Sequence, residues 1–177
     1  MNSITPQNPR VLAIAPCVQG IGYIVFTDPR SPIDWGVKWT RHDKNITGLT
    51  KVRELIDRYD PGAVIIEDAY GTGAKRSQRT KDLLDDIVAL VNDRGIRVVS
   101  YSRDRVRQTF SSDGAITKYQ IAKIIAGQIP ELAPRLPVER KIWLPEHANM
   151  SIFGGASLAL TYFMSLMPAD DVLDLAA

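Results

Sequence analysis

Two clusters of basic side chains are the part of this sequence with the plainest chemical use. The first holds four cations within seven residues and no acid, and the second holds five cations within fourteen residues, opposed only by Asp104. Such clusters can bind the phosphates of nucleic acid, but charge runs are also ordinary on solvated surfaces, and both interpretations stay open. The first cluster consists of Lys75, Arg76, Arg79 and Lys81, and the second of Arg94, Arg97, Arg103, Arg105 and Arg107.

A single carboxylate, Glu67, ends a short apolar run at residues 63–66 and is followed by Asp68. Successive side chains of a strand point to opposite faces, so Asp68 is expected to face away from Glu67. A carboxylate at the end of a buried strand can have a purely structural role. It can cap a neighbouring helix or pair with Lys118 or an arginine.

The composition is that of one ordinary globular domain. The chain has 177 residues, of which 45% are hydrophobic and 24% charged, and its net charge is only +2. We expect one domain over residues 10–167, with flexible segments at residues 1–9 and 168–177. No apolar run reaches the roughly 20 residues that span a bilayer, and no secretory signal is present, so a cytoplasmic location away from membranes is expected. The lone Cys17 excludes an intrachain disulfide, and no Cys/His spacing suits zinc.

The elements that position these residues begin with three strands joined by short turns. In the third, Trp35, Val37 and Trp39 alternate with other residues, and both tryptophans are interpreted as packing residues. Two later strands are separated by helices, and the apolar run at 63–66 predicts a central strand covered on both faces. The order predicts a mixed five-stranded sheet, three antiparallel strands then two parallel, with helices on both faces. The strands are expected at residues 10–16, 20–26, 33–40, 63–67 and 96–101.

Helical spacing fills most of the remaining chain. Ser77, Ser102 and Thr117 can each cap a helix, and the proline-rich residues 128–145 predict an extended surface loop. Gly154 and Gly155 lie inside the last helical stretch, where each glycine costs about 1 kcal/mol relative to alanine. Close backbone approach, a kink and the loss of a functional side chain are the three interpretations of this pair. The helices are expected at residues 45–59, 77–93, 102–110, 118–126 and 150–166.

This order of elements, with these strand ends, resembles the ribonuclease H-like fold and most closely the RuvC family of Holliday-junction endonucleases. The similarity extends over residues 11–162. Its most specific parts are the first hairpin with Gly20, Gly22 and Tyr23, the strand at 64–67, and the helix at 152–160. In such enzymes carboxylates from separate elements converge on two magnesium ions roughly 4 Å apart. Magnesium is a hard ion that prefers oxygen ligands.

The resemblance implies an aspartate ending the first strand, a glutamate ending the fourth, and an acidic pair on the last helix. The corresponding residues here are Ala15, Glu67, Ser151 and Gly154, so three of the four positions lack a carboxylate. Glu67 is then either a remnant metal ligand or the structural carboxylate described above. Lys118 resembles a family lysine that contacts a DNA phosphate, and the upstream Glu146 and His147 are further candidate metal ligands.

Three functions follow, in order of preference. The first is a pseudonuclease that binds branched or duplex DNA, or a partner protein, without cutting and without a cofactor. The second is a Mg²⁺-dependent structure-specific endodeoxyribonuclease with a rearranged site around Glu67, helped by Glu146, His147 and Asp68. The third is a protein–protein interaction module on the same scaffold. A homodimer is possible in each case. The residues predicted to contact nucleic acid are Lys75, Arg76, Arg79, Lys81 and Lys118.

Overall fold

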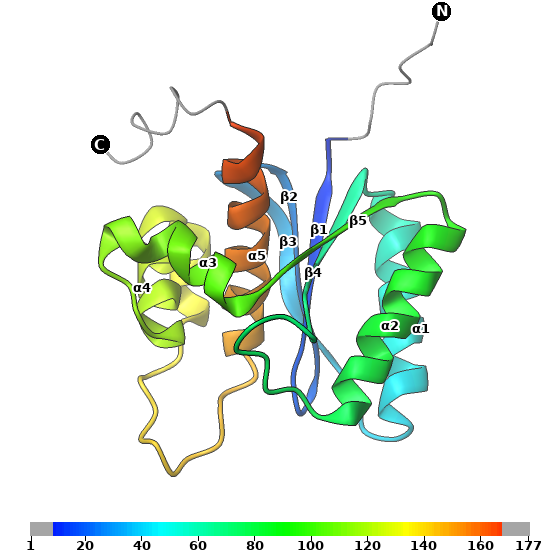
Figure 1. Ribbon diagram of the computed structural model, residues 1–177, viewed down its shortest axis with the longest axis horizontal. Helices are drawn as coiled ribbons and strands as arrows, with labels where there is room; N and C mark the ends of the chain where they lie inside the picture. Colours follow the sequence, from blue (N-terminus) through cyan, green and yellow to red (C-terminus); the bar gives the residue numbers. More distant parts are fainter. Residues whose placement is uncertain (1–8, 168–177) are drawn as a thin grey trace, which may run out of the picture.

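Five strands form one mixed sheet in the computed structural model, which describes residues 9–167 (Figure 1). The strand order is β3-β2-β1-β4-β5. The first three strands pair in antiparallel fashion, and β4 and β5 continue the sheet in parallel with β1, as predicted. The predicted flexible ends lie, apart from Pro9, outside the described residues. The strands are β1 (Val11–Pro16), β2 (Gly20–Asp28), β3 (Ser31–Trp39), β4 (Ala63–Glu67) and β5 (Arg97–Tyr101).

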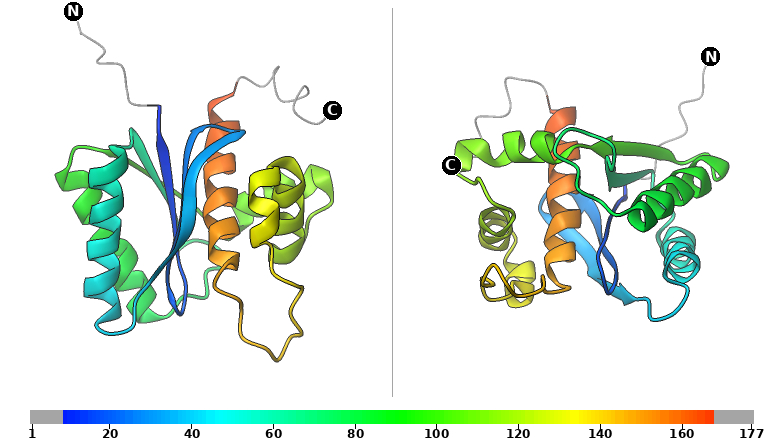
Figure 2. Two further views of the ribbon diagram at one scale, coloured as in Figure 1. Left: turned by 180° about the vertical axis from the view of Figure 1, so that it is seen from behind. Right: turned by 60° about the horizontal axis from the view of Figure 1, so that its bottom comes forward.

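Helices cover both faces of the sheet, which confirms the predicted architecture. One face is covered by α1 and α2, and the other by α5, against which α3 and α4 pack (Figure 2). None of the described helices is long and apolar enough to cross a membrane. The helices are α1 (Lys44–Tyr59), α2 (Gln78–Asp93), α3 (Arg103–Phe110), α4 (Lys118–Gln128) and α5 (Met150–Leu166), with short 3-10 helices η1 (Ser111–Asp113) and η2 (Pro130–Arg135).

The three predicted helix caps are all present. The hydroxyl groups of Ser77 and Ser102 each accept a backbone N–H from the residue three positions later, at 3.3 and 3.2 Å. Thr117 forms a full capping box with Gln120, in which each side chain accepts a backbone N–H at the other residue. These caps fix the first residues of α2, α3 and α4, two of which carry side chains of the candidate site.

Two expectations about apolar residues were wrong. Residues 128–145 are not loop throughout, because η2 interrupts them and Ile129 and Leu132 are buried in the core beside α4 and α5. Trp35 packs at the border of the core, but Trp39 is 58% exposed. Trp39 is the last residue of β3, an edge strand with a neighbour on one side only, so little of the fold is available to cover it.

Candidate functional site

The four positions at which the resemblance implies metal ligands lie together in one cleft. Ala15 lies near the carboxyl end of β1 and Glu67 ends β4, and these parallel neighbours bring both residues to the same edge of the sheet. Ser151 and Gly154 lie in the first turns of α5. All four residues line a cleft of about 250 Å³. Its other walls come from the β1–β2 turn, α3, α4 and the loop that precedes α5.

Small residues allow α5 to approach the sheet closely beside this cleft. A Cβ atom on Gly22 of β2 would lie 2.2 Å from the Ser151 hydroxyl oxygen, and one on Gly155 would lie 3.5 Å from the carbonyl oxygen of Ala13. Gly154 faces Ala15, since a Cβ on Gly154 would lie 3.4 Å from that of Ala15. Close approach therefore requires a glycine at position 22, whereas a Cβ on Gly155 would make only ordinary van der Waals contacts. The helix α5 is uninterrupted from Met150 to Leu166, so the glycine pair does not break it.

Glu67 is buried and both of its carboxylate oxygens are paired with arginines. Oε2 accepts two hydrogen bonds from Arg76, one from Nε at 2.8 Å and one from Nη2, and Oε1 accepts one from Nε of Arg103 at 3.0 Å. Burial by itself would raise the pKa of the Glu67 carboxyl group, but the hydrogen bonds and charges of the two arginines outweigh it and lower this pKa. Glu67 is thus held ionised by two permanent cations.

The topology explains why these two arginines meet Glu67. Arg76 lies immediately before Ser77, the cap of α2, in the loop that leaves β4. Arg103 is the first residue of α3 and follows β5, whose last residue, Tyr101, pairs in parallel register with Glu67. The sequence placed both arginines in basic clusters, but only Arg76 was among the residues predicted to contact nucleic acid. The available signal was the position of Arg103 just beyond the strand that neighbours β4.

The residues of the cleft do not fit a magnesium ion. Ala15 and Gly154 offer no ligand atom, and the hydroxyl group of the buried Ser151 donates a hydrogen bond to the carbonyl oxygen of Ala148 at 2.6 Å. Both oxygens of Glu67 are occupied by guanidinium groups. Within residues 9–167, no group of three or more His, Cys, Asp or Glu side chains could hold a metal ion.

The other candidate metal ligands are engaged elsewhere. Glu146 lines the cleft, but its Oε1 lies 2.5 Å from Nζ of Lys118, the first residue of α4. His147 accepts the backbone N–H of Asn149 on its Nδ1 at 3.1 Å and does not line the cleft. The structure therefore brings Glu146 into the same cleft as Glu67 and pairs each carboxylate with basic groups.

The five predicted nucleic-acid contacts divide into two sets. Arg76 and Lys118 line the cleft, whereas Lys75, Arg79 and Lys81 do not. On α2, Arg79 contacts the side chain of Asn45 on α1, and the Lys81 ammonium lies 5.2 Å from the ring centroid of Tyr70. Two arginines of the second cluster, Arg103 and Arg107, complete the basic side chains of the cleft.

Solved structures of Holliday-junction resolvases share this fold. No family model and no curated protein matches the sequence. RuvC of Thermus thermophilus in complex with a Holliday-junction substrate is 17% identical, with a TM-score of 0.63, over 88% of this chain and 94% of that one. The yeast mitochondrial Holliday-junction resolvase Ydc2 is 15% identical, with a TM-score of 0.58, over 92% and 80%.

A third structure extends the likeness to a viral protein. The fowlpox virus resolvase in complex with Holliday-junction DNA is 16% identical, with a TM-score of 0.52, over 88% of this chain and 99% of that one. The match spans nearly the full length of the resolvases and most of the described residues. At these identities the likeness concerns the fold. The chain therefore has the ribonuclease H-like fold of the RuvC-type Holliday-junction resolvases.

Proposed function

We propose that this chain binds the phosphodiester backbone of nucleic acid in the cleft and does not cleave it. The observation that carries the proposal is the pair of guanidinium groups on Glu67. At the position where the resemblance implies metal ions, this chain places two side-chain cations on the one remaining acid. The likeness to two resolvases solved with Holliday-junction DNA supports DNA, and branched DNA in particular, as the ligand.

The arginines keep donors available for a phosphate group. Arg76 uses Nε and Nη2 on Glu67, and Arg103 uses only Nε, which leaves Nη1 of the first and both terminal nitrogens of the second. A guanidinium group binds phosphate oxygens in a planar, often bidentate arrangement. Arg107 and Lys118 add two further cations to the same cleft. The cleft is lined by four cationic side chains and two carboxylates, Glu67 and Glu146. Its lining therefore has a net charge of about +2.

The same side chains are poorly suited to hydrolysis. A nuclease must remove a proton from the attacking water, and a guanidinium group does not deprotonate at physiological pH. Glu67 has a lowered pKa and both oxygens in ion pairs, so it is a weak base. Ala15 and Gly154 provide no replacement. The second carboxylate of the cleft, Glu146, is likewise ion-paired, with Lys118. The cleft therefore holds cations for a phosphodiester, while both of its carboxylates are engaged in ion pairs.

The proposal is tested by binding and cleavage assays on a Holliday junction, a duplex and a single strand, with and without Mg²⁺. We expect binding that weakens steeply with salt, and no cleavage. Glu67→Gln removes a negative charge from the cleft and is expected to strengthen binding several-fold and to steepen the salt dependence by up to about 0.9 in log–log slope. The control Glu54→Gln removes an exposed carboxylate from α1, on the opposite face, and should leave binding unchanged.

Two results would contradict the proposal. Cleavage by the wild-type protein that disappears in Glu67→Gln would identify a working endonuclease with a rearranged site. Absence of binding to every substrate at low salt would instead favour a protein–protein interaction module, in which the basic cleft has no nucleic-acid ligand. A thermal melt of Glu67→Gln is needed alongside, because the substitution leaves two arginines without their carboxylate.

A further inference from the structure

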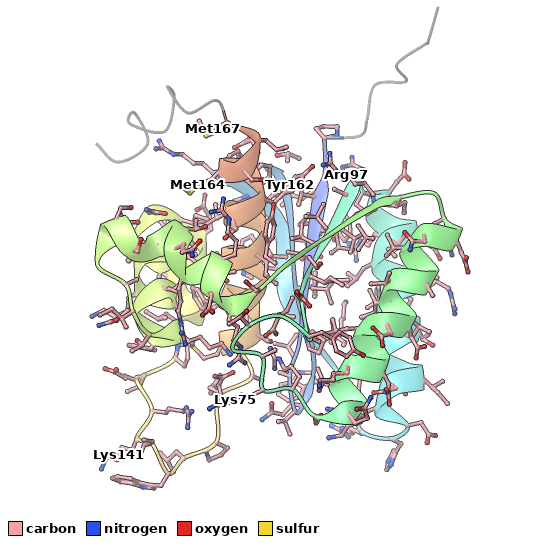
Figure 3. All side chains as sticks on the ribbon, in the orientation of Figure 1. Lys75, Arg97, Lys141, Tyr162, Met164 and Met167 are labelled. Carbon is pink, nitrogen blue, oxygen red and sulfur yellow. The ribbon has the colours of Figure 1, made fainter. Side chains whose placement is uncertain are left out.

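The loop of residues 136–149, between η2 and α5, presents apolar side chains to solvent. Val138, Ile142 and Trp143 are exposed by 91, 89 and 73%, respectively. The loop extends away from α4 and α5 at the lower end of Figure 1, and Lys141 lies near its far end in Figure 3. Apolar side chains that are this exposed on one short loop are unfavourable in water, which directs attention to a ligand or partner that covers them.

The tip of this loop is held in shape by its own hydrogen bonds. The backbone N–H of Leu144 donates to the carbonyl oxygen of Lys141 at 2.9 Å, which closes a turn around Ile142 and Trp143. The Arg140 guanidinium group donates to the carbonyl oxygens of Ile142 and Leu144. The polar groups thus fix the backbone while the apolar side chains face solvent. A tip that is already ordered loses little conformational entropy when it binds.

The base of the loop connects the tip to the cleft. The Asn149 side-chain amide donates to the carbonyl oxygen of Arg135 at 3.1 Å and ties the two ends of the loop together. Pro145 and Glu146 belong to the wall of the cleft, and Glu146 is paired with Lys118 of α4. Trp143 at the tip is therefore only two residues away from Pro145 of the cleft wall.

The charges at the tip favour nucleic acid over a protein surface. The Lys141 ammonium lies 5.4 Å from the ring centroid of Trp143, and Arg140 adds a second cation next to it in sequence. The exposed Glu139 opposes them, so these three side chains carry a net charge of about +1. A nucleic-acid strand offers both flat base rings and phosphates, which match an aromatic ring flanked by cations. A second copy of this chain would bring the same positive charges against the tip in a symmetric contact, which is unfavourable.

We infer that Trp143 stacks on an unpaired nucleobase of a strand whose phosphates lie in the cleft. This inference rests on the proposed function and adds to it the recognition of bases that are free of their duplex partners. Every base has a flat face, so stacking of this kind discriminates open from paired nucleic acid and not one sequence from another. Lys141 and Arg140 support the stacked strand by their charge.

The test compares strands with and without bases, using fluorescence anisotropy on the full chain. The probes are oligothymidylate and an abasic strand of the same length, which keeps the phosphates and removes the rings. We expect the wild-type protein to prefer oligothymidylate by about 5- to 150-fold, the range for one stacked base. Trp143→Ala should lose this preference and bind both strands as the wild type binds the abasic one, whereas Trp143→Phe should keep most of it.

The matched control is Trp39→Ala, which removes the other strongly exposed tryptophan from the end of β3 and should keep the preference. A preference that survives Trp143→Ala overturns the inference and leaves the proposed function standing. Failure of the wild type to bind either strand or a duplex at low salt overturns both. Light scattering supplies a third outcome: a wild-type dimer that becomes monomeric in Trp143→Ala, with base preference unchanged, would assign the tip to self-association instead.

Discussion

Glu67 illustrates how the neighbours of a residue decide its chemistry. A glutamate at the end of this strand could bind a metal ion if further carboxylates faced it. Here Ala15 and Gly154 line the same cleft without a carboxylate, and the oxygens of Glu67 accept hydrogen bonds from Arg76 and Arg103. The carboxylate keeps its negative charge, but the cations that balance it belong to the protein. The two arginines balance the charge of Glu67, so the cluster needs no metal ion from solution.

The lowered pKa of Glu67 predicts a pH-dependent contribution to stability. A group whose pKa is lower in the folded than in the unfolded state stabilises the fold above its unfolded pKa, and this contribution disappears as pH falls through the folded pKa. We therefore expect Glu67→Gln to lower the melting temperature at neutral pH, because it leaves the two arginines unpaired. The difference from the wild type should shrink below about pH 4, as Glu67 of the wild type becomes protonated.

Melting curves of both proteins between pH 7 and pH 3 measure this difference directly. Other carboxylates also titrate in this range, but they do so in both proteins and cancel in the comparison. Glu54→Gln serves as the exposed control and should melt like the wild type throughout. A Glu67→Gln deficit that stays constant down to pH 3 would contradict the lowered pKa of Glu67.

At the scale of elements, local signals in the sequence were sufficient for the sheet, the caps and the last helix. Ser77, Ser102 and Thr117 begin helices because capping depends on residues three positions apart. The pairing of Glu67 with Arg103 was not predictable in the same way. It joins residues 36 positions apart and depends on the parallel register of β4 and β5, which no local pattern specifies.

The same distinction explains the two errors on apolar residues. The prolines correctly indicated an irregular path after residue 128. The burial of Leu132, however, depends on packing against α4 and α5, and the sequence of the proline-rich segment does not specify where those helices lie. Alternation in β3 suggested that Trp39 packs inward, yet Trp39 is the last residue of an edge strand, where little of the fold is available to cover it. Period and composition predict the type of an element, whereas burial at its ends depends on its neighbours.

The close approach of α5 to β2 gives a prediction at this scale. In Gly22→Ala the new methyl group would lie within 2.6 Å of the Ser151 side chain and of its backbone carbonyl carbon, so the helix must shift. Overpacking of this kind costs about 1–3 kcal/mol. Gly127→Ala in α4 is the matched control, because nothing lies within 4 Å of its added Cβ and alanine favours a helix by up to about 1 kcal/mol.

Urea denaturation of the wild type and the two variants measures their free energies of unfolding and so tests this prediction. Gly22→Ala should be less stable than the wild type and Gly127→Ala equally or more stable. A shift of α5 also moves Ser151 and Gly154 relative to Ala15 and Glu67. We therefore expect Gly22→Ala to weaken nucleic-acid binding as well. Equal stability of both variants would contradict the tight packing between Gly22 and Ser151.

Over the whole molecule, the distribution of charge matters more than its sum. A net charge of +2 hardly distinguishes this chain from any soluble protein. The fold nevertheless gathers into one cleft Arg76 from the loop before α2, Arg103 and Arg107 from α3, and Lys118 from α4. Of the cluster at residues 75–81, which is dense in sequence, only Arg76 lines the cleft. Position in the fold, and not density along the chain, selects the basic residues that share a site.

We therefore predict that removing one positive charge from the cleft weakens DNA binding more than removing one from elsewhere on the surface. Arg107 lines the cleft and has only a loose, exposed ion pair with Asp104, at 3.5 Å, so Arg107→Gln should hardly affect stability. It should weaken binding to duplex DNA and reduce the slope of log affinity against log salt by about 0.9, the value for one lost phosphate contact. Arg53→Gln changes the net charge equally on the exposed side of α1, across the sheet from the cleft, and should leave the slope unchanged. Anisotropy titrations between 50 and 200 mM salt resolve such a difference, because each phosphate contact lowers the affinity by about 3.5-fold over this range. Equal slopes for the two variants would mean that the protein binds DNA through its overall charge, and the cleft would then not be the binding site.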